Sequence, residues 1–237
     1  MKRLLLLLLS AMPIGCSSTQ PFATTVGIMK PGTTMVVRIT DARLDAYQPE
    51  ARQRRDLFTV TATALRKSTP DAPRLRATPR GVIVDARAPL VSLLVRVPDR
   101  VNLAVESRHG DVNVTDIPGN ARVVALAGNV NLMLPGYAQA AVGTGNLSVT
   151  MGSTNWPGTL HFSTQRGDIV LRVIGKAPFD VRLHTDDGTL FTDFGLRGTS
   201  QGRSETINGE VNGGGPQSID VETRAGAIRL LRLQPQP

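Results

Sequence analysis

Carboxylates that directly follow glycines are the first residues in this chain whose type and spacing could do chemistry. In LAVESRHGDVNV, residues 103–114, Asp111 follows Gly110, and Asp168 and Glu210 follow later glycines in the same way. Glycoside hydrolases need two carboxyl groups about 5–9.5 Å apart. If the copies stack in chain order at about 4.8 Å per layer, Asp168 lies about 14 Å from Asp111 and about 10 Å from Glu210. Neither pair suits hydrolysis, so we interpret these acids as bend residues whose oxygens bond nearby backbone N–H groups.

A denser acidic segment, HTDDGT at residues 184–189, offers two further kinds of site. Its oxygens could bind Ca²⁺, which prefers several oxygen ligands, but the segment lacks the nonapeptide spacing of calcium-binding β-rolls. It could also complete the site of a polysaccharide lyase or hydrolase built on a β-helix. The best set available for that enzyme is Asp168 with Asp186 or Asp187 and Arg166 or Arg182. We favour ordinary turn carboxylates over both.

Other motifs that support catalysis or cofactor binding do not occur in the sequence. His109, His161 and His184 lie one, six and four places before the motif glycine that follows each, so they do not form the convergent ligand set that zinc needs. There is no G-x-S-x-G nucleophile motif, no P-loop and no dinucleotide fingerprint. The sequence therefore predicts a protein without metal, cofactor or enzymatic activity.

The N-terminus, MKRLLLLLLSAMPIGCSS, has the layout of an export signal. Lys2 and Arg3 precede six leucines, a run too short to span a bilayer, which takes about 20 residues. Residues 1–15 are therefore predicted to be a signal peptide. The only cysteine, Cys16, follows directly, and Met-Pro-Ile-Gly-Cys resembles a bacterial lipobox. That resemblance implies a lipid anchor on Cys16 and, with Ser17 next, sorting to the outer membrane; a plain secretory signal cleaved nearby is the alternative.

The composition narrows the classes of partner. The 237 residues carry a net charge of +8, and only 4% of them are aromatic. The densest basic cluster, ARQRRD at residues 51–56, contains no aromatic side chain on which a nucleobase could stack. We therefore expect no nucleic-acid partner. The expected partners are the membrane, through the anchor, and an envelope polysaccharide or protein, because a basic surface attracts anionic polymers.

The acids belong to a unit that repeats from residue 101 onward. A glycine recurs at intervals of 17–22 residues, and the residue two places after it is always apolar. These glycines are Gly110, Gly128, Gly145, Gly167, Gly188, Gly209 and Gly226. The residues directly after them are Asp111, Asn129, Asn146, Asp168, Thr189, Glu210 and Ala227. Apolar alternation on both sides of most of these glycines predicts two strands that meet at a bend, where glycine supplies the positive φ.

One such unit cannot bury its apolar face alone, so stacked copies are expected to share a core. The prediction is an all-β fold, a β-solenoid similar to a single-stranded β-helix, with about seven two-strand repeats and an N-terminal β cap. An antiparallel β-sandwich is the alternative, because Gly-Asp and Gly-Asn also close hairpins. The predicted segments are a flexible tether at 16–30, an N-terminal β segment at 31–89 and a repeat domain at 90–233. Open strand edges at the ends of the stack would permit weak self-association.

Two blocks of sequence carry a family resemblance. LLVRVPDRVNLAVESRHGDVNVTDIPGNARV and INGEVNGGGPQSIDVETRAGAIRLL resemble the bacterial putative-adhesin domain family of unknown function, over about residues 90–233. The resemblance implies an extracytoplasmic β-solenoid, often membrane-anchored, without an established enzymatic activity. We therefore expect a membrane-tethered, adhesin-like binding or structural protein of the bacterial cell envelope, facing the periplasm or the cell surface. The β-helix lyase or hydrolase around Asp168 is the alternative.

Overall fold

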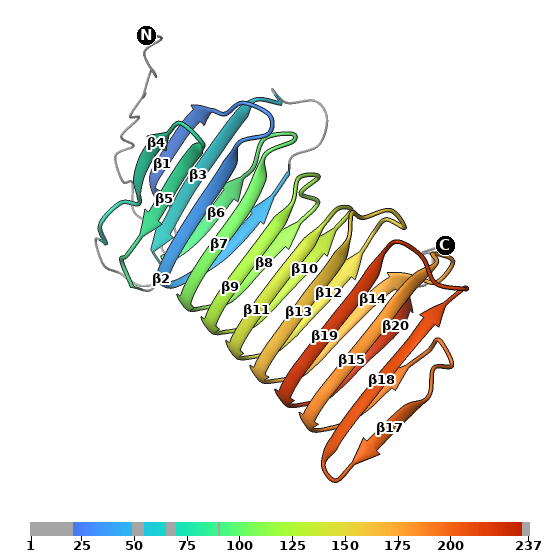
Figure 1. Cartoon of the computed structure of the whole chain (residues 1–237). Coiled ribbons are helices and arrows are strands. Elements are labelled where there is room, and N and C mark those ends of the chain that lie inside the picture. Colours follow the sequence, from blue (N-terminus) through green and yellow to red (C-terminus); the bar gives the residue numbers. More distant parts are fainter. Residues whose placement is uncertain (1–20, 49–54, 65–69, 90, 234–237) are drawn as a thin grey trace. The chain divides into compact units, whose positions relative to one another are not determined.

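The structure, a computed structural model, describes residues 21–48, 55–64, 70–89 and 91–233 (Figure 1). These residues form 20 β-strands and no helix, so no membrane-crossing helix is found among them. Strands of successive repeats pair in parallel, which confirms the predicted β-solenoid over the antiparallel sandwich. The chain divides into two compact units, Met1–Gly119 and Asn120–Pro237, called here the N-terminal and C-terminal units. The predicted signal peptide and Cys16 lie outside the described residues.

The N-terminal unit contains two groups of paired strands, sheet A and sheet B. Sheet A has the order β1(Pro21–Ile28), β3(Leu57–Ala64), β6(Val91–Arg96), the second half of β2(Thr34–Tyr47), and β8(Val112–Thr115). Sheet B has the order β4(Arg74–Thr78), β5(Gly81–Ala86), the first half of β2, and β7(Asn102–His109). The long strand β2 therefore contributes to both sheets of its unit.

Strand β2 changes the predicted division of this region. Within β2, Val37 pairs with Val84 of β5 on one side and with Val105 of β7 on the other, both in parallel. Strand β2 is thus interior to the unit, because it pairs with β5 and β6 on one side and with β7 and β8 on the other, whereas β4 pairs with β5 only. Pro21–Ile28, expected to be part of a flexible tether, form strand β1, which pairs with β3.

The C-terminal unit repeats the two-sheet arrangement. Its sheet A consists of the parallel strands β10(Val130–Leu134), β12(Leu147–Met151), β14(Ile169–Ile174), β20(Ile228–Leu233) and β16(Leu190–Thr192). Its sheet B starts with the parallel strands β9(Ala121–Ala127), β11(Ala138–Thr144), β13(Thr159–Arg166), β19(Ser218–Ala225) and β15(Phe179–Asp187). It ends with the antiparallel strands β18(Ser204–Val211) and β17(Gly198–Gln201).

The layers of this unit do not stack in chain order. The last repeat, β19 with β20, lies between the layer of β13 and β14 and the layer of β15 and β16. Figure 1 shows this directly, with the red β19 between the yellow β13 and the orange β15. The C-terminal strands are therefore interior strands, hydrogen-bonded on both edges. Layer separations calculated from chain order do not apply beyond Asp168.

Alternating side chains from both sheets fill the core of the C-terminal unit. Leu160 and Phe162 of β13 are buried, and so are Ile169 and Leu171 of β14, because every second residue of a strand points to the same side. Trp156 is 2% exposed. Its ring lies 5.8 Å from that of Phe179, and its N–H donates to the Ser218 carbonyl at 3.4 Å. The single tryptophan, which lies between β12 and β13, thus contacts β15 and β19. Its fluorescence therefore reports on the packing of this core.

Candidate functional site

In the C-terminal unit, most motif glycines form a column at the bends between the two sheets. Gly167 has a φ of +145°, and a Cβ atom built on it would lie 2.0 Å from the Gly145 carbonyl oxygen. A side chain at this position therefore overlaps the backbone of the neighbouring layer. Positive φ also occurs at Gly110, Gly128, Gly145 and Gly226.

Two motif glycines differ from this pattern. Gly188 stands in the column, and its Cβ would lie 1.9 Å from the Gly226 carbonyl oxygen, but its φ is not in the positive range. Gly209 lies within β18, where it pairs with Val181, and not at a bend. A Cβ at Gly209 would lie 2.8 Å from the Leu196 side chain, so glycine at this position makes room for Leu196. The repeat that contains Gly209 is a single antiparallel strand, which is why its glycine has another role.

Residues that follow the glycines link successive layers through their side-chain oxygens. The Asn129 oxygen accepts a hydrogen bond from the backbone N–H of Asn146 at 3.0 Å, and the Asn146 oxygen accepts one from the N–H of Asp168 at 2.9 Å. The Asp168 carboxylate accepts one from the N–H of Ala227 at 2.8 Å. In this ladder, side-chain oxygens accept hydrogen bonds from backbone N–H groups of the next layer. In the N-terminal unit, Asp111 follows the Gly110 bend, and its carbonyl accepts from the N–H of Leu44 at 2.9 Å.

We expect Asp168→Ala to lower the free energy of unfolding by about 1 kcal/mol, the usual net value of one hydrogen bond. Asp168→Asn keeps an acceptor oxygen and should change stability by less than half of that. Urea unfolding followed by Trp156 fluorescence measures both. A wild-type protein that releases reducing ends from polysaccharides, and loses this activity with Asp168→Ala, would contradict a purely structural role for Asp168.

A second set of bend residues was missed by the sequence interpretation. The Thr164 and Thr223 hydroxyls donate to the Gly167 carbonyl at 3.0 and 3.2 Å, and the Thr185 hydroxyl donates to the Gly226 carbonyl at 3.1 Å. All three threonines are buried. The signal was present in the sequence, because each of them lies three places before a motif glycine.

The best set for an enzyme does not converge in the structure. Asp168 is in the layer of β14 and Asp186 is in the layer of β15, and the layer of β19 and β20 separates them. At about 4.8 Å per strand this is about 10 Å. Asp186 lies 3.0 Å from the Nε2 atom of His184, whereas Asp187 forms an ion pair with Arg203. Among the described residues, no group of three His, Cys, Asp or Glu side chains is placed to hold a metal ion.

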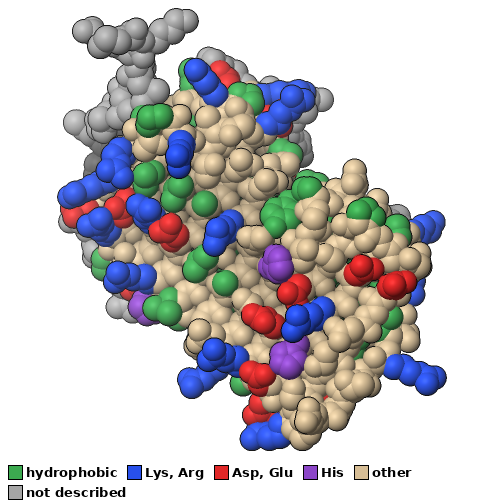
Figure 2. All heavy atoms as spheres, viewed as in Figure 1, with side chains coloured by type: hydrophobic (Ala, Val, Ile, Leu, Met, Phe, Trp, Pro, Cys, Tyr) green, Lys and Arg blue, Asp and Glu red, His purple; other side chains and the backbone are tan. Residues whose placement is uncertain are grey.

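Charged side chains gather instead on the outer side of sheet B in the C-terminal unit. This polar face is defined here by His161 and Ser163 of β13, Asp220 and Glu222 of β19, and Arg182 and His184 of β15. The strand register aligns His161 with Asp220 and Arg182 in one row, and Ser163 with Glu222 and His184 in the next. Figure 2 shows histidine, acidic and basic side chains side by side on this surface.

Three contacts hold the histidines of the polar face. His161 Nδ1 lies 3.5 Å from Asp220 Oδ2, and the imidazole of His184 bridges Thr206 at 2.9 Å and Asp186 at 3.0 Å. Arg182 points to solvent. The polar face therefore offers hydrogen-bond donors and acceptors at strand spacing, on a backbone that the parallel ladder keeps rigid.

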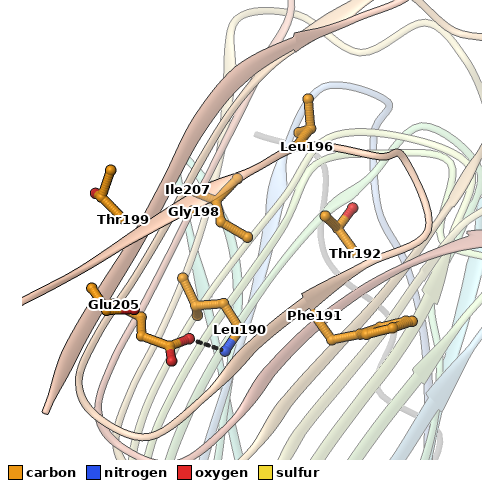
Figure 3. A pocket seen from close by; sticks show the side chains of 9 residues that line it. Leu190, Phe191, Thr192, Leu196, Gly198, Thr199, Glu205 and Ile207 are labelled. Atoms are coloured by element: carbon orange, nitrogen blue, oxygen red, sulfur yellow. Dashed lines mark hydrogen bonds between the residues drawn. The ribbon is translucent and has the colours of Figure 1, made fainter.

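A separate pocket of about 340 Å³ lies where sheet A of the C-terminal unit ends (Figure 3). Residues of β16, β17 and β18 line it, together with Leu196. Glu205 of β18 accepts a hydrogen bond from the backbone N–H of Leu190 at 2.8 Å. Figure 3 shows this carboxylate directed at the backbone of β16. No single sequence motif marked this pocket, because it results from the unequal numbers of strands in the two sheets. Sheet B continues with β18 and β17 where sheet A ends at β16.

Parallel two-strand layers, glycine bends and an amide ladder define a β-solenoid repeat protein. The chain belongs to the Toastrack DUF4097 family, whose model matches residues 98–231, more than half of the sequence. No curated protein matches it.

Solved structures resemble this one at low sequence identity. One, described as a putative cell adhesion protein from Clostridium sporogenes, is 10% identical, covers 90% of this chain and 100% of its own, and has a TM-score of 0.47. A putative adhesin from Bacteroides fragilis is also 10% identical, covers 89% of this chain and 96% of its own, and has a TM-score of 0.35.

Proposed function

We propose that this protein is a non-enzymatic, adhesin-like binding protein of the bacterial cell envelope. The polar face of the C-terminal unit is the observation that supports this most. Its side chains lie in cross-strand rows on an ordered sheet, so their order and spacing are set before a partner arrives. Such preorganisation reduces the entropy lost on binding. The Asp168 carboxylate of the bend column, in contrast, accepts a hydrogen bond from a backbone N–H.

The expected partner is an envelope polysaccharide or protein that can follow the rows of the polar face. Donors and acceptors alternate there, with Arg182, Asp220 and His161 in one row, so a polymer with repeated hydroxyl or amide groups could bond several at once. The tether proposed at Cys16 would place the molecule on the outer membrane, toward the periplasm or the cell surface. Membership of the family does not by itself indicate an enzymatic activity or a ligand. This assignment therefore rests on the chemistry of the polar face.

Changing Cys16 to serine should release the protein from the membrane. The thiol is the only group in the chain that can take the lipid of a lipoprotein, and stable anchoring needs buried acyl chains. Fractionation of cells should move the variant from the envelope pellet to the soluble fraction, with loss of incorporated labelled palmitate. An unchanged pellet with unchanged label would contradict the tether.

The binding role is tested separately, by measuring how strongly the immobilised protein retains envelope components. Purified envelope polysaccharide and envelope protein fractions are passed over the immobilised full chain. Arg182→Glu reverses a charge on the polar face, and Arg229→Glu makes the same change on the outer side of sheet A. Retention should fall at least about fivefold with the first variant and stay unchanged with the second, since charge complementarity selects partners. Equal retention by both would exclude the polar face as the binding surface.

A further inference from the structure

The two sheets of the C-terminal unit end at different layers. Sheet B continues past β15 with β18 and β17, whereas sheet A ends at β16. Within the described residues, β16 pairs with β20 only. Ile207 of β18 is buried and lines the pocket, together with Leu196 and Leu190. The pocket is therefore the place of a missing strand of sheet A.

Some backbone groups of β16 point into this pocket. The Thr189 carbonyl accepts from the N–H of Ile228, and the N–H of Asp193 donates to the Leu230 carbonyl, so these residues face β20. Backbone direction alternates along a strand, which turns Leu190 and Thr192 to the other edge. The N–H of Leu190 donates there to the Glu205 carboxylate, which occupies the position of a strand carbonyl. The carbonyl of Leu190 and both backbone groups of Thr192 are left for an added strand.

Besides β16, the described strands β1, β4 and β17 each pair on one side only, and of these three β1 alone has large exposed apolar side chains. Among the described residues, β1 pairs with β3 only. Its sequence, PFATTVGI, contains no acidic residue, so it suits a pocket that already holds the Glu205 carboxylate. Val26 and Ile28 are 41% and 50% exposed, although both are apolar and lie on the strand. Leu196 and Ile207 in the wall of the pocket are aliphatic as well.

We propose that β1 of one copy adds to the open edge of β16 in a second copy and extends its sheet A. Strand addition to an exposed edge is a common mode of recognition, in which main-chain hydrogen bonds supply affinity and a pocket takes alternate side chains. The contact joins two different surfaces, so it is head-to-tail. Because β16 has three residues, the association should be weak and reversible. This inference goes beyond the proposed function, since neither Cys16 nor the polar face takes part.

The test uses fluorescein-labelled PFATTVGI as a probe for the full chain, kept soluble in detergent micelles. Fluorescence polarisation should show saturable binding to the wild-type protein. Thr192→Pro removes the edge N–H without touching the β20 ladder, and proline is tolerated on such an edge. We expect it to weaken binding about tenfold. Thr192→Val also loses the hydroxyl that accepts from the N–H of Phe194, but it keeps the backbone N–H, so it should bind like the wild type.

Sedimentation velocity supplies the second measurement, which needs no peptide. The wild-type protein and Thr192→Val should sediment faster as concentration rises, and Thr192→Pro should not. Trp156 fluorescence shows whether each variant is folded. Three results would overturn the proposal: no peptide binding at 1 mM, about the upper limit of useful weak affinity; equal binding of a scrambled peptide; or concentration-dependent sedimentation that survives in folded Thr192→Pro.

Discussion

Gly167→Ala should lower the free energy of unfolding of the C-terminal unit by about 3–5 kcal/mol. Two effects add: an unfavourable backbone conformation and a steric overlap with the neighbouring layer. The φ of +145° is one that side chains rarely adopt, and the added Cβ would lie 2.0 Å from the Gly145 carbonyl oxygen, which belongs to the backbone of the next layer. Because the Gly145 N–H donates to the Arg166 carbonyl and the Gly167 N–H donates to the Ala225 carbonyl, neither backbone can move without breaking hydrogen bonds.

The measurement is urea unfolding followed by the fluorescence of Trp156, which is buried in the same unit. Gly158→Ala is the matched control. Gly158 also has a positive φ, +68°, but no atom lies within 4 Å of its Cβ position. It should cost about 1–2 kcal/mol, the value for a left-handed conformation alone. Equal effects of the two substitutions would show that the close approach of layers at the bend has little energetic weight.

Deletion of residues 216–237 should unfold the C-terminal unit rather than shorten it by one layer. A solenoid stacked in chain order would lose only its last repeat, and the others would keep their partners. Here the last repeat is hydrogen-bonded on both sides, to β13 and β14 and to β15 and β16. Its removal leaves the inner apolar faces of two separated layers without a neighbour.

A single substitution makes the same test without truncation. Val221 of β19 is fully buried, whereas Glu222 next to it is exposed. Val221→Asp buries an unpaired charge and should cost more than about 4 kcal/mol, while Glu222→Lys should change stability by less than about 0.5 kcal/mol. We expect the deletion and Val221→Asp to lose the cooperative unfolding transition of Trp156 fluorescence, and Glu222→Lys to keep it. A deletion variant with an unchanged transition would mean that β15 and β16 are stable without β19.

Local patterns in the sequence were sufficient for the strands and most of the bends. Alternation around Gly145 and Gly167 reflects which side of a strand faces the core, and this depends on neighbouring residues only. The side chains of Asn146 and Asp168 accept hydrogen bonds from backbone N–H groups, and their position directly after a bend glycine is also a local feature. The alternation around Gly209 was weaker, and there the local pattern did not identify the antiparallel strand β18.

The sequence by itself determined that the chain forms two-strand units with glycine at the bends, because side-chain alternation and the conformational freedom of glycine are local properties. Only the tertiary structure decided the order of the layers. Parallel strands of similar repeats offer nearly the same apolar faces, so the sequence carries little information on which repeat lies beside which. The insertion of β2 and of β19, the rows of the polar face and the open edge of β16 all follow from that order, and none of them can be found from the repeats alone.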